Sequence, residues 1–159
     1  MKRAVLIIFA LLVTTACSSE RREPDGNMRW IDVYYADSGE EIISSEQRAI
    51  VAENNITVMI KDAIEQMQQK PIGGNLKPLL PENAELVSAK FDHGVARIAF
   101  SDGYLSLEGM DKTMTDCGIL MTLSNFWNIR AVEIAVGETI VTPEFSQKDI
   151  VVEIPKGQE

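Results

Sequence analysis

The sequence predicts an α+β fold, in which a mainly antiparallel sheet carries two helices packed on one face. Three observations lead to this prediction. Short runs rich in β-branched and aromatic residues occur in neighbouring pairs. Two longer stretches have apolar residues at helical spacing, and a tight-turn signal joins two of the strand-like runs. Strands grouped with helices in this order are typical of α+β domains.

The chain begins with the pattern of a bacterial lipoprotein signal peptide. Lys2 and Arg3 precede an apolar run over residues 4–13, which is too short to cross a bilayer core. Small residues then lead to a cysteine, so we expect cleavage between Ala16 and Cys17 and attachment of a diacylglycerol to the Cys17 thiol. Two acyl chains give stable anchoring. The sequence therefore predicts a lipid-anchored protein on the extracytoplasmic face of the cell membrane, with an ordinary secreted protein as the alternative.

The expected organisation is a signal peptide (1–16), a lipidated tether (17–28), a single domain (29–155) and a polar tail (156–159). The part after the tether has roughly 130 residues, enough for one compact domain and too few for two. Loss of the signal peptide removes two cations, so the formal charge moves from −9 to −11. A surface this acidic argues against nucleic acid and anionic lipid headgroups as partners.

The first half of the domain predicts a hairpin followed by a helix. Polar and apolar residues alternate over 29–35, and the Asp37-Ser38-Gly39 turn signal ends this expected strand. A second extended stretch is expected over 46–52. Asn54 and Asn55 are good N-caps for the helix that follows. Its expected apolar stripe ends before Pro71 and comprises Ile56, Met59, Ile60, Ala63, Ile64 and Met67.

The second half predicts a hairpin, a helix and two more strands. Residues 85–91 and 95–100 flank Asp92-His93-Gly94, a tight-turn signal, because glycine accepts positive φ without steric cost. The second helix is expected to begin near Ser106, with its hydroxyl as the cap, and Gly118 within it indicates the close approach of another element. Strands are expected over 130–136 and 150–154, with a turn at Gly137 between them. The expected buried stripe of the second helix is Met110, Met114, Cys117 and Met121, joined by Ile119, Leu120, Leu123 and Trp127.

In order and spacing, these segments resemble the GerM domain, the sporulation and spore-germination domain found in lipoproteins. The resemblance runs from Val33-Tyr34-Tyr35 to about Ile154. The chain departs from the family pattern at 70–74, where a glycine-proline pair is usual, and at His93. The other segments that carry the resemblance are the leucine-proline segment 79–86, the hairpin 89–101, the helix end 121–126 and the strand 129–137.

The resemblance implies a membrane-anchored protein of spore-forming or related Gram-positive bacteria. In the best understood members it implies assembly of an envelope-spanning complex during sporulation. The family has no established catalytic residue, so the resemblance also implies a protein that is not an enzyme. Some members carry two copies of the domain, whereas this chain has one.

The residues themselves offer little chemistry. His93 is the only histidine, is expected in an exposed turn, and is remote in sequence from Cys117, which we interpret as a small buried hydrophobe. No zinc-ligand spacing occurs, and Gly73-Gly74 lacks the context of a phosphate loop. A glycosidase-like pair would have to come from acids that we expect to be solvated: Glu40, Glu41, Asp102 and Glu108. We expect no metal and no cofactor.

Two functions remain open at this point. The first is a non-catalytic module that acts in sporulation, germination or envelope complex assembly through protein contacts, by offering a sheet edge or an open sheet face to envelope proteins. The alternative is a module that binds cell-wall glycan, such as peptidoglycan, or a small ligand. In that case exposed aromatic side chains would stack on sugar rings, and the candidates are Trp30, Tyr34, Tyr35 and Tyr104.

Overall fold

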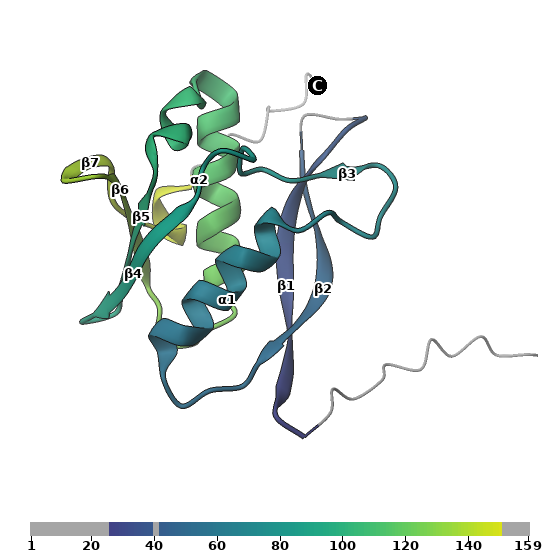
Figure 1. Cartoon of the computed structure of the whole chain (residues 1–159), viewed down its shortest axis with the longest axis vertical. Coiled ribbons are helices and arrows are strands. Elements are labelled where there is room, and N and C mark those ends of the chain that lie inside the picture. Colours follow the sequence, from purple (N-terminus) through teal and green to yellow (C-terminus); the bar gives the residue numbers. More distant parts are fainter. Residues whose placement is uncertain (1–25, 40–41, 151–159) are drawn as a thin grey trace, which may run out of the picture.

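Two β-sheets enclose two helices in the computed structural model, which describes residues 26–39 and 42–150. Helix α1 (Ile56–Gln68) and helix α2 (Gly109–Leu123) lie between the sheets (Figure 1). The first sheet has the order β2-β1-β3 and contains β1 (Met28–Asp37), β2 (Ile43–Val51) and β3 (Leu76–Lys77). The second has the order β4-β5-β6-β7 and contains β4 (Leu86–Asp92), β5 (Val95–Phe100), β6 (Ala131–Val136) and β7 (Thr139–Ser146).

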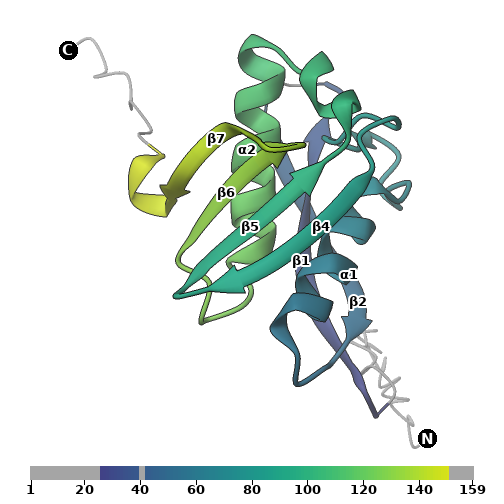
Figure 2. The ribbon, with the colours of Figure 1, turned by 60° about the vertical axis from the view of Figure 1, so that its left-hand side comes forward.

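The α+β class is confirmed, although the strands divide between two sheets instead of forming one. Both helices cover the same face of the four-stranded sheet, and the three-stranded sheet covers their other side (Figure 2). Pairing is antiparallel except between β5 and β6, which are parallel. Parallel neighbours need a long crossover connection, and here η1 (Asp102–Ser106) and α2 provide it.

The predicted first hairpin is confirmed. β1 extends beyond the predicted strand at both ends, whereas β2 begins three residues earlier and ends one residue earlier than predicted. β1 and β2 pair over their whole lengths, and the inward side chains of β1 include Ile31, Val33 and Tyr35, all at most 1% exposed. The short strand β3 was not predicted. It pairs with only Ala36 and Asp37 of β1, and a two-residue strand has no alternating pattern to detect.

Thr122 of α2 and Asn125 of the loop after it complete the edge of β1 that β2 leaves free. Tyr34 N donates to Thr122 Oγ1 at 3.2 Å, and Asp32 N donates to Asn125 Oδ1 at 3.1 Å. Asn125 Nδ2 returns a bond of 2.9 Å to Asp32 O. Buried backbone groups need hydrogen-bond partners. The hydroxyl of Thr122 and the side-chain amide of Asn125 supply these partners in place of a neighbouring strand.

Helix α1 begins where the sequence predicts. The Asn55 side chain accepts a hydrogen bond of 3.0 Å from Thr57 N, which identifies it as the N-cap. Such a cap typically contributes about 1 kcal/mol. The buried side chains are those of the predicted apolar stripe, namely Ile60, Ala63, Ile64 and Met67.

The predicted hairpin of β4 and β5 is confirmed, with a two-residue turn. His93 (φ 48°) and Gly94 (φ 90°) both lie in the left-handed region, as a type I′ hairpin turn requires. Histidine tolerates this region better than most side chains. The turn also packs on the chain before β6, since Gly94 O accepts a bond of 2.7 Å from Arg130 N.

The predicted start of the second helix is wrong by three residues. α2 begins at Gly109, and Glu108 is its N-cap residue without a side-chain capping bond. Ser106 instead ends the 3₁₀ helix η1, where its hydroxyl donates to Gly103 O at 2.8 Å. The two helices cannot be continuous because Gly109 has φ 53°, outside the helical region.

The predicted buried stripe of α2 is only partly right. Ile119, Leu120 and Leu123 are buried as expected, whereas Met110 is 62% exposed and Trp127 is 92% exposed. The remaining buried positions are polar or small: Thr115, Asp116, Gly118 and Thr122. A side chain at Gly118 would collide with Leu79, so the predicted close approach of another element is confirmed.

Strand β6 and the turn at Gly137 are confirmed, and the strand after them lies earlier than predicted. Gly137 has φ 59°, and β7 returns antiparallel to β6 over residues 139–146. Of the predicted strand 150–154, Ile150 is described and is not in a strand. Residues 151–154, the cleavage residues Ala16 and Cys17, and Glu40 and Glu41 lie outside the described residues. None of the helices described is both long and apolar enough to cross a membrane.

Candidate functional site

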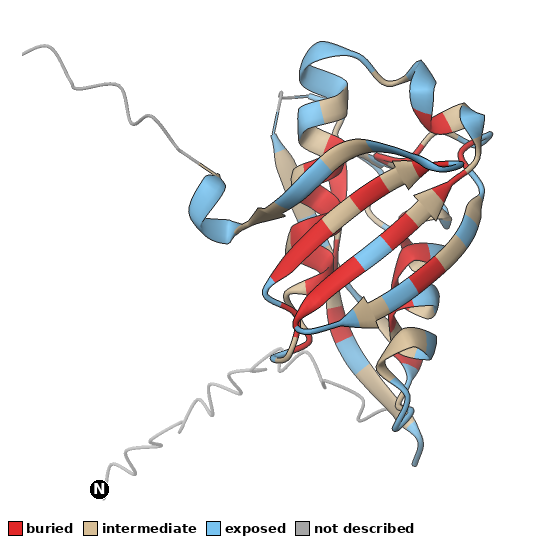
Figure 3. Ribbon diagram, turned by 90° about the vertical axis from the view of Figure 1, so that its left-hand side faces the viewer, coloured by how far each residue is buried: buried red, intermediate tan, exposed pale blue. Residues whose placement is uncertain are grey.

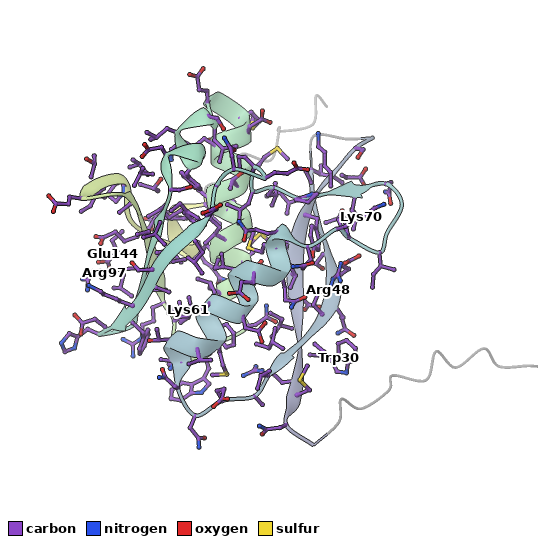
Figure 4. The ribbon with its side chains drawn as sticks, in the orientation of Figure 1. Trp30, Arg48, Lys61, Lys70, Arg97 and Glu144 are labelled. Carbon is purple, nitrogen blue, oxygen red and sulfur yellow. The ribbon has the colours of Figure 1, made fainter. Side chains whose placement is uncertain are left out.

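One face of the four-stranded sheet has no helix over it. Figure 3 looks directly onto this face, and the helices lie behind the strands. Arg97 and Glu144, labelled in Figure 4, project on this side, away from the helices. We call this surface the open sheet face. By strand register, its accessible side chains include Ser88, Lys90, Asp92, Arg97, Ala99, Glu133, Ala135, Ile140 and Ser146. Val95 and Ala131 are paired on the same side but are buried.

The open sheet face combines a flat floor with charges of both signs. Ala99 and Ala135 are directly paired across β5 and β6, so the face has only methyl groups at this pair. Beside them Arg97 bonds Glu133 at 3.1 Å and Asp92 at 3.3 Å. Exposed ion pairs of this kind contribute at most about 1 kcal/mol to stability. The charges are therefore available to exchange their present partners for those of another protein.

A second polar group of residues is buried where η1, α2 and β7 meet. Asp116 accepts hydrogen bonds from the Tyr104 hydroxyl, from Lys112 Nζ at 2.6 Å and from Thr142 Oγ1 at 3.0 Å. Burial and the Asp116 charge raise the pKa of Tyr104 well above its usual value, so the hydroxyl stays protonated. Tyr104 also stacks on Phe100, with ring centroids 4.8 Å apart. Each group here bonds another, and the set joins three elements to one another.

A third polar group holds the connection after α1 against β2. The Glu46 carboxylate accepts from Ile72 N at 2.9 Å and from Gly73 N at 3.1 Å, and it pairs with Arg48 at 2.5 Å. Arg48 in turn donates to Lys70 O at 2.7 Å. Two adjacent backbone N–H groups are the donors that a phosphate would use. In this chain its own carboxylate occupies them, which agrees with a structural role for the glycine pair.

The Glu46 carboxylate makes the stability of the domain decrease at acidic pH. Partial burial acts to raise the pKa of Glu46, but the N–H donors of Gly73 and Ile72 and the Arg48 guanidinium outweigh it and lower the pKa. A lowered folded pKa gives stability that is complete above the unfolded value, near 4.5, and is lost as the pH falls through the folded value.

We expect Glu46→Gln to lower the free energy of unfolding by about 1 kcal/mol at pH 7 and to flatten its decline below pH 4.5. Urea unfolding at a series of pH values measures both effects. Glu65→Gln, at an exposed position of α1, is the matched control and should leave the pH profile unchanged. An acid limb as steep in Glu46→Gln as in the original protein would contradict the role of this carboxylate.

The structure does not assemble the catalytic candidates considered from the sequence. His93 lies in the β4–β5 turn with its Nε2 3.5 Å from Asp92 Oδ1, and no interaction of the described residues joins it to Cys117. Burial and the neighbouring Asp116 raise the pKa of Cys117, so its thiol is protonated at neutral pH and is a weak nucleophile. Over residues 26–39 and 42–150, no three His, Cys, Asp or Glu side chains converge as a metal site.

The acids considered for a glycosidase-like pair take ordinary structural positions. Asp102 is the first residue of η1 and lines a shallow depression together with Glu85. Glu108 is the exposed N-cap residue of α2. A groove of about 490 Å³ lies between the end of β1, the segment 77–81 and the start of α2, and its lining contains no aromatic side chain.

Two of the four aromatic candidates for sugar stacking are unavailable. Tyr35 is 0% exposed, with its hydroxyl donating to Gln66 O at 2.8 Å, and Tyr104 is 1% exposed. Tyr34 is half-buried, and Trp30 is 37% exposed on β1. The most exposed aromatic side chain in the described structure is Trp127, which sequence reasoning assigned to the buried stripe of α2.

Fold and sites together define a small α+β domain in which two sheets enclose two helices. Its buried polar groups serve packing, and the outer face of its four-stranded sheet has no helix over it. The family model for sporulation and spore germination, Germane, matches residues 32–142. The chain belongs to this family. No curated protein matches the sequence.

Solved structures have the same fold. The first GerMN domain of the sporulation protein GerM from Bacillus subtilis is 17% identical with a TM-score of 0.62, covering 76% of this chain and 99% of that one. The tandem GerMN domains of the same protein are 13% identical with a TM-score of 0.59, covering 77% of this chain and 47% of that one. A candidate lipoprotein from Clostridium perfringens is 20% identical with a TM-score of 0.54, covering 77% and 90%. This chain spans about half the length of the tandem.

Proposed function

We propose that this chain is an extracytoplasmic lipoprotein, anchored through acylated Cys17, whose domain has no catalytic site. It acts in sporulation or germination by binding other envelope proteins. The observation that carries this proposal is the open sheet face, an uncovered surface of four strands whose opposite face packs on the two helices. A flat β-surface binds a partner by shape and by pairing of charges.

The rest of the described structure supports binding in preference to chemistry. The Asp116 and Glu46 groups use their charges on neighbouring side chains and backbone. The thiol of Cys117 is held protonated. A catalytic site instead needs groups that converge on open space beside the reacting atoms. Family membership supports a role in sporulation or germination, and the lipobox at Ala16-Cys17 supports anchoring.

Charge reversal on the open sheet face tests the proposal. The full-length chain and its Arg97→Glu variant would be crosslinked in membranes of sporulating cells, and the captured proteins identified. We expect Arg97→Glu, which places a third acid beside Asp92 and Glu133, to lose specific partners. Lys61→Glu makes the same charge change on the exposed face of α1 (Figure 4) and should retain them.

Two further measurements separate the parts of the proposal. Cys17→Ala should release the protein from membranes while the far-ultraviolet circular dichroism of the purified domain stays unchanged. Unaltered membrane fractionation of this variant would contradict acylation. Co-sedimentation of the protein with peptidoglycan, together with capture that is the same in Arg97→Glu and Lys61→Glu, would instead favour a wall-binding module.

A further inference from the structure

The end of the domain at which the tether joins brings together segments that are distant in sequence. β1 starts here, at the lower end of Figure 1, beside the end of β2 and the start of α1. Asn27 O accepts a bond of 2.7 Å from Ala52 N, and Val51 N donates to Asp62 of α1 at 2.9 Å. The loop that follows α2, residues 124–130, lies against the first residues of β1. We call this region the tether end.

The loop 124–130 is held firmly to β1. Arg29 donates to Asn125 O at 3.2 Å, and its guanidinium lies over the Phe126 ring, 5.2 Å from the centroid. Phe126 and Ile129 are buried, at 1% and 7% exposure. Between them Trp127 is 92% exposed, more than any other large apolar side chain described. The indole of Trp127 therefore projects into solvent from a loop that is anchored by its buried neighbours, and it is not part of the core.

Other apolar side chains are uncovered at the same end. Trp30 of β1 and Val51 of β2 are each 37% exposed, and Val58 in the first turn of α1 is 42% exposed. Tryptophan is enriched where one end of a side chain meets hydrocarbon and the other meets water, which is the level of lipid headgroups.

Acidic side chains are more numerous at the end of the domain far from the tether, which also has Lys77, than at the tether end, where Arg29 and Arg130 lie with Glu53 and Asp62. Arg130 is the only charged residue in the segment 124–131. The groove and the depression described above are lined by the end of β1 and by the loops at the end of the domain far from the tether. Those loops, with the neighbouring β6–β7 turn, carry Glu82, Glu85, Asp102, Glu108, Asp111 and Glu138. A negatively charged membrane surface would repel that end and leave the tether end facing it.

We propose that the tether end rests on the lipid surface, with Trp127 inserted among the headgroups. This inference depends on the proposed acylation of Cys17. Ten residues separate Cys17 from Met28, a length that reaches at most about 35 Å. The tether end is therefore kept close to the bilayer, where insertion costs little further loss of freedom. The open sheet face then stands to the side of the anchor and the acidic loops point away from the membrane.

A protein partner fits this end less well than lipid does. A standard protein interface buries about 800 Å² on each partner, whereas a whole tryptophan side chain supplies roughly 200 Å². The other exposed apolar side chains at this end, those of Trp30, Val51 and Val58, add little because each is only 37–42% exposed. A protruding indole suits the bilayer interface, where affinity comes from the anchor and from apolar insertion together.

Tryptophan fluorescence of the anchored protein tests the inference. The chain has two tryptophans, so Trp30→Phe leaves Trp127 as the single emitter. The acylated full-length variant would be reconstituted in phosphatidylcholine vesicles whose acyl chains carry bromine near the headgroup. We expect a blue shift of the emission and a loss of intensity relative to vesicles without bromine. The control variant combines Trp30→Phe, Trp127→Phe and Leu105→Trp, which moves the emitter to an exposed position in η1, and its emission should be unaffected.

Flotation of the same vesicles distinguishes the two proposals. Protein that floats and shows the same unquenched emission from Trp127 as from the control overturns membrane contact while leaving the anchor intact. Protein that fails to float overturns the anchor, and the orientation with it. Quenching in floated Trp30→Phe protein, absent from the control, supports the inference.

Discussion

Replacement of Gly103 by alanine is expected to destabilise the domain by about 3 kcal/mol, the upper end of overpacking costs. A Cβ at this position would overlap the carbonyl of Asn83 and come within 2.8 Å of Ala84 N. The obstructing atoms belong to backbone that cannot easily retreat. Ser101 bonds both sides of it, since its hydroxyl donates to Asn83 O at 2.9 Å and accepts from Glu85 N at 2.9 Å.

Gly74→Ala is the matched control for this change. No heavy atom lies within 4 Å of a Cβ at Gly74, and its backbone is not left-handed, so we expect a change of less than about 0.5 kcal/mol. Urea unfolding followed by circular dichroism compares the two variants. If Gly103→Ala is as stable as Gly74→Ala, the tight approach of η1 to the segment before β4 is wrong.

Asp116→Ala is expected to cost about 3 kcal/mol as well, for an electrostatic reason. The change leaves the buried Tyr104 hydroxyl without its acceptor and leaves Lys112 with Thr142 but without its anionic partner. Removal of one partner from a largely buried ion pair costs about this much. Because Thr142 of β7 also loses its acceptor, the edge of the four-stranded sheet should loosen first. Hydrogen exchange of the β7 amides, measured beside the free energy of unfolding, detects that loosening.

The control for Asp116→Ala is Glu65→Ala, which removes an exposed acid from α1. We expect it to change the free energy of unfolding by less than about 0.5 kcal/mol. Equal stabilities for the two variants would show that the Asp116 group contributes nothing beyond what a surface acid does. Faster exchange in β1 than in β7 after Asp116→Ala would show that the group holds a different part of the domain.

Elements formed by local interactions were predictable from the sequence. Helix α1 follows from a cap residue and an apolar stripe, both within one segment. The β4–β5 hairpin follows from Asp92-His93-Gly94, because a two-residue loop at positive φ sets the pairing of its strands. In each case the residues that determine the structure are neighbours in the chain.

Elements that depend on distant partners were missed. β7 contains Pro143 and exposed polar residues, so its sequence does not show the alternating apolar pattern of a strand with one buried face. It forms a strand because it pairs with β6. The apolar segment 150–154 has the more regular pattern and attracted the prediction instead. Edge strands that carry proline and irregular pairing are common, and their weak patterns limit prediction of this kind.

The polar sites divide in the same way. Lys112 and Asp116 are four residues apart on one helix, a spacing typical of an ion pair. The pair was not predicted because the apolar residues of this segment dominated the interpretation of the helix. The bond of Glu46 to Gly73 joins positions 27 residues apart and has no sequence signal. Exposure of Trp127 could not be read from its spacing with Leu120 and Leu123, because the helix ends at Leu123 and its periodicity ends there too.

Thr122 and Asn125 have a consequence for the solubility of the protein. A strand with free N–H and C=O groups is a template on which another extended chain can add, and repeated addition produces aggregates. These two side chains block that growth along the middle of β1. A single substitution at Thr122 or Asn125 would leave the buried apolar residues unchanged and would still expose backbone groups of β1 with which another strand can pair. The side chains at the end of α2 and in the loop after it therefore protect this edge of β1 against self-association.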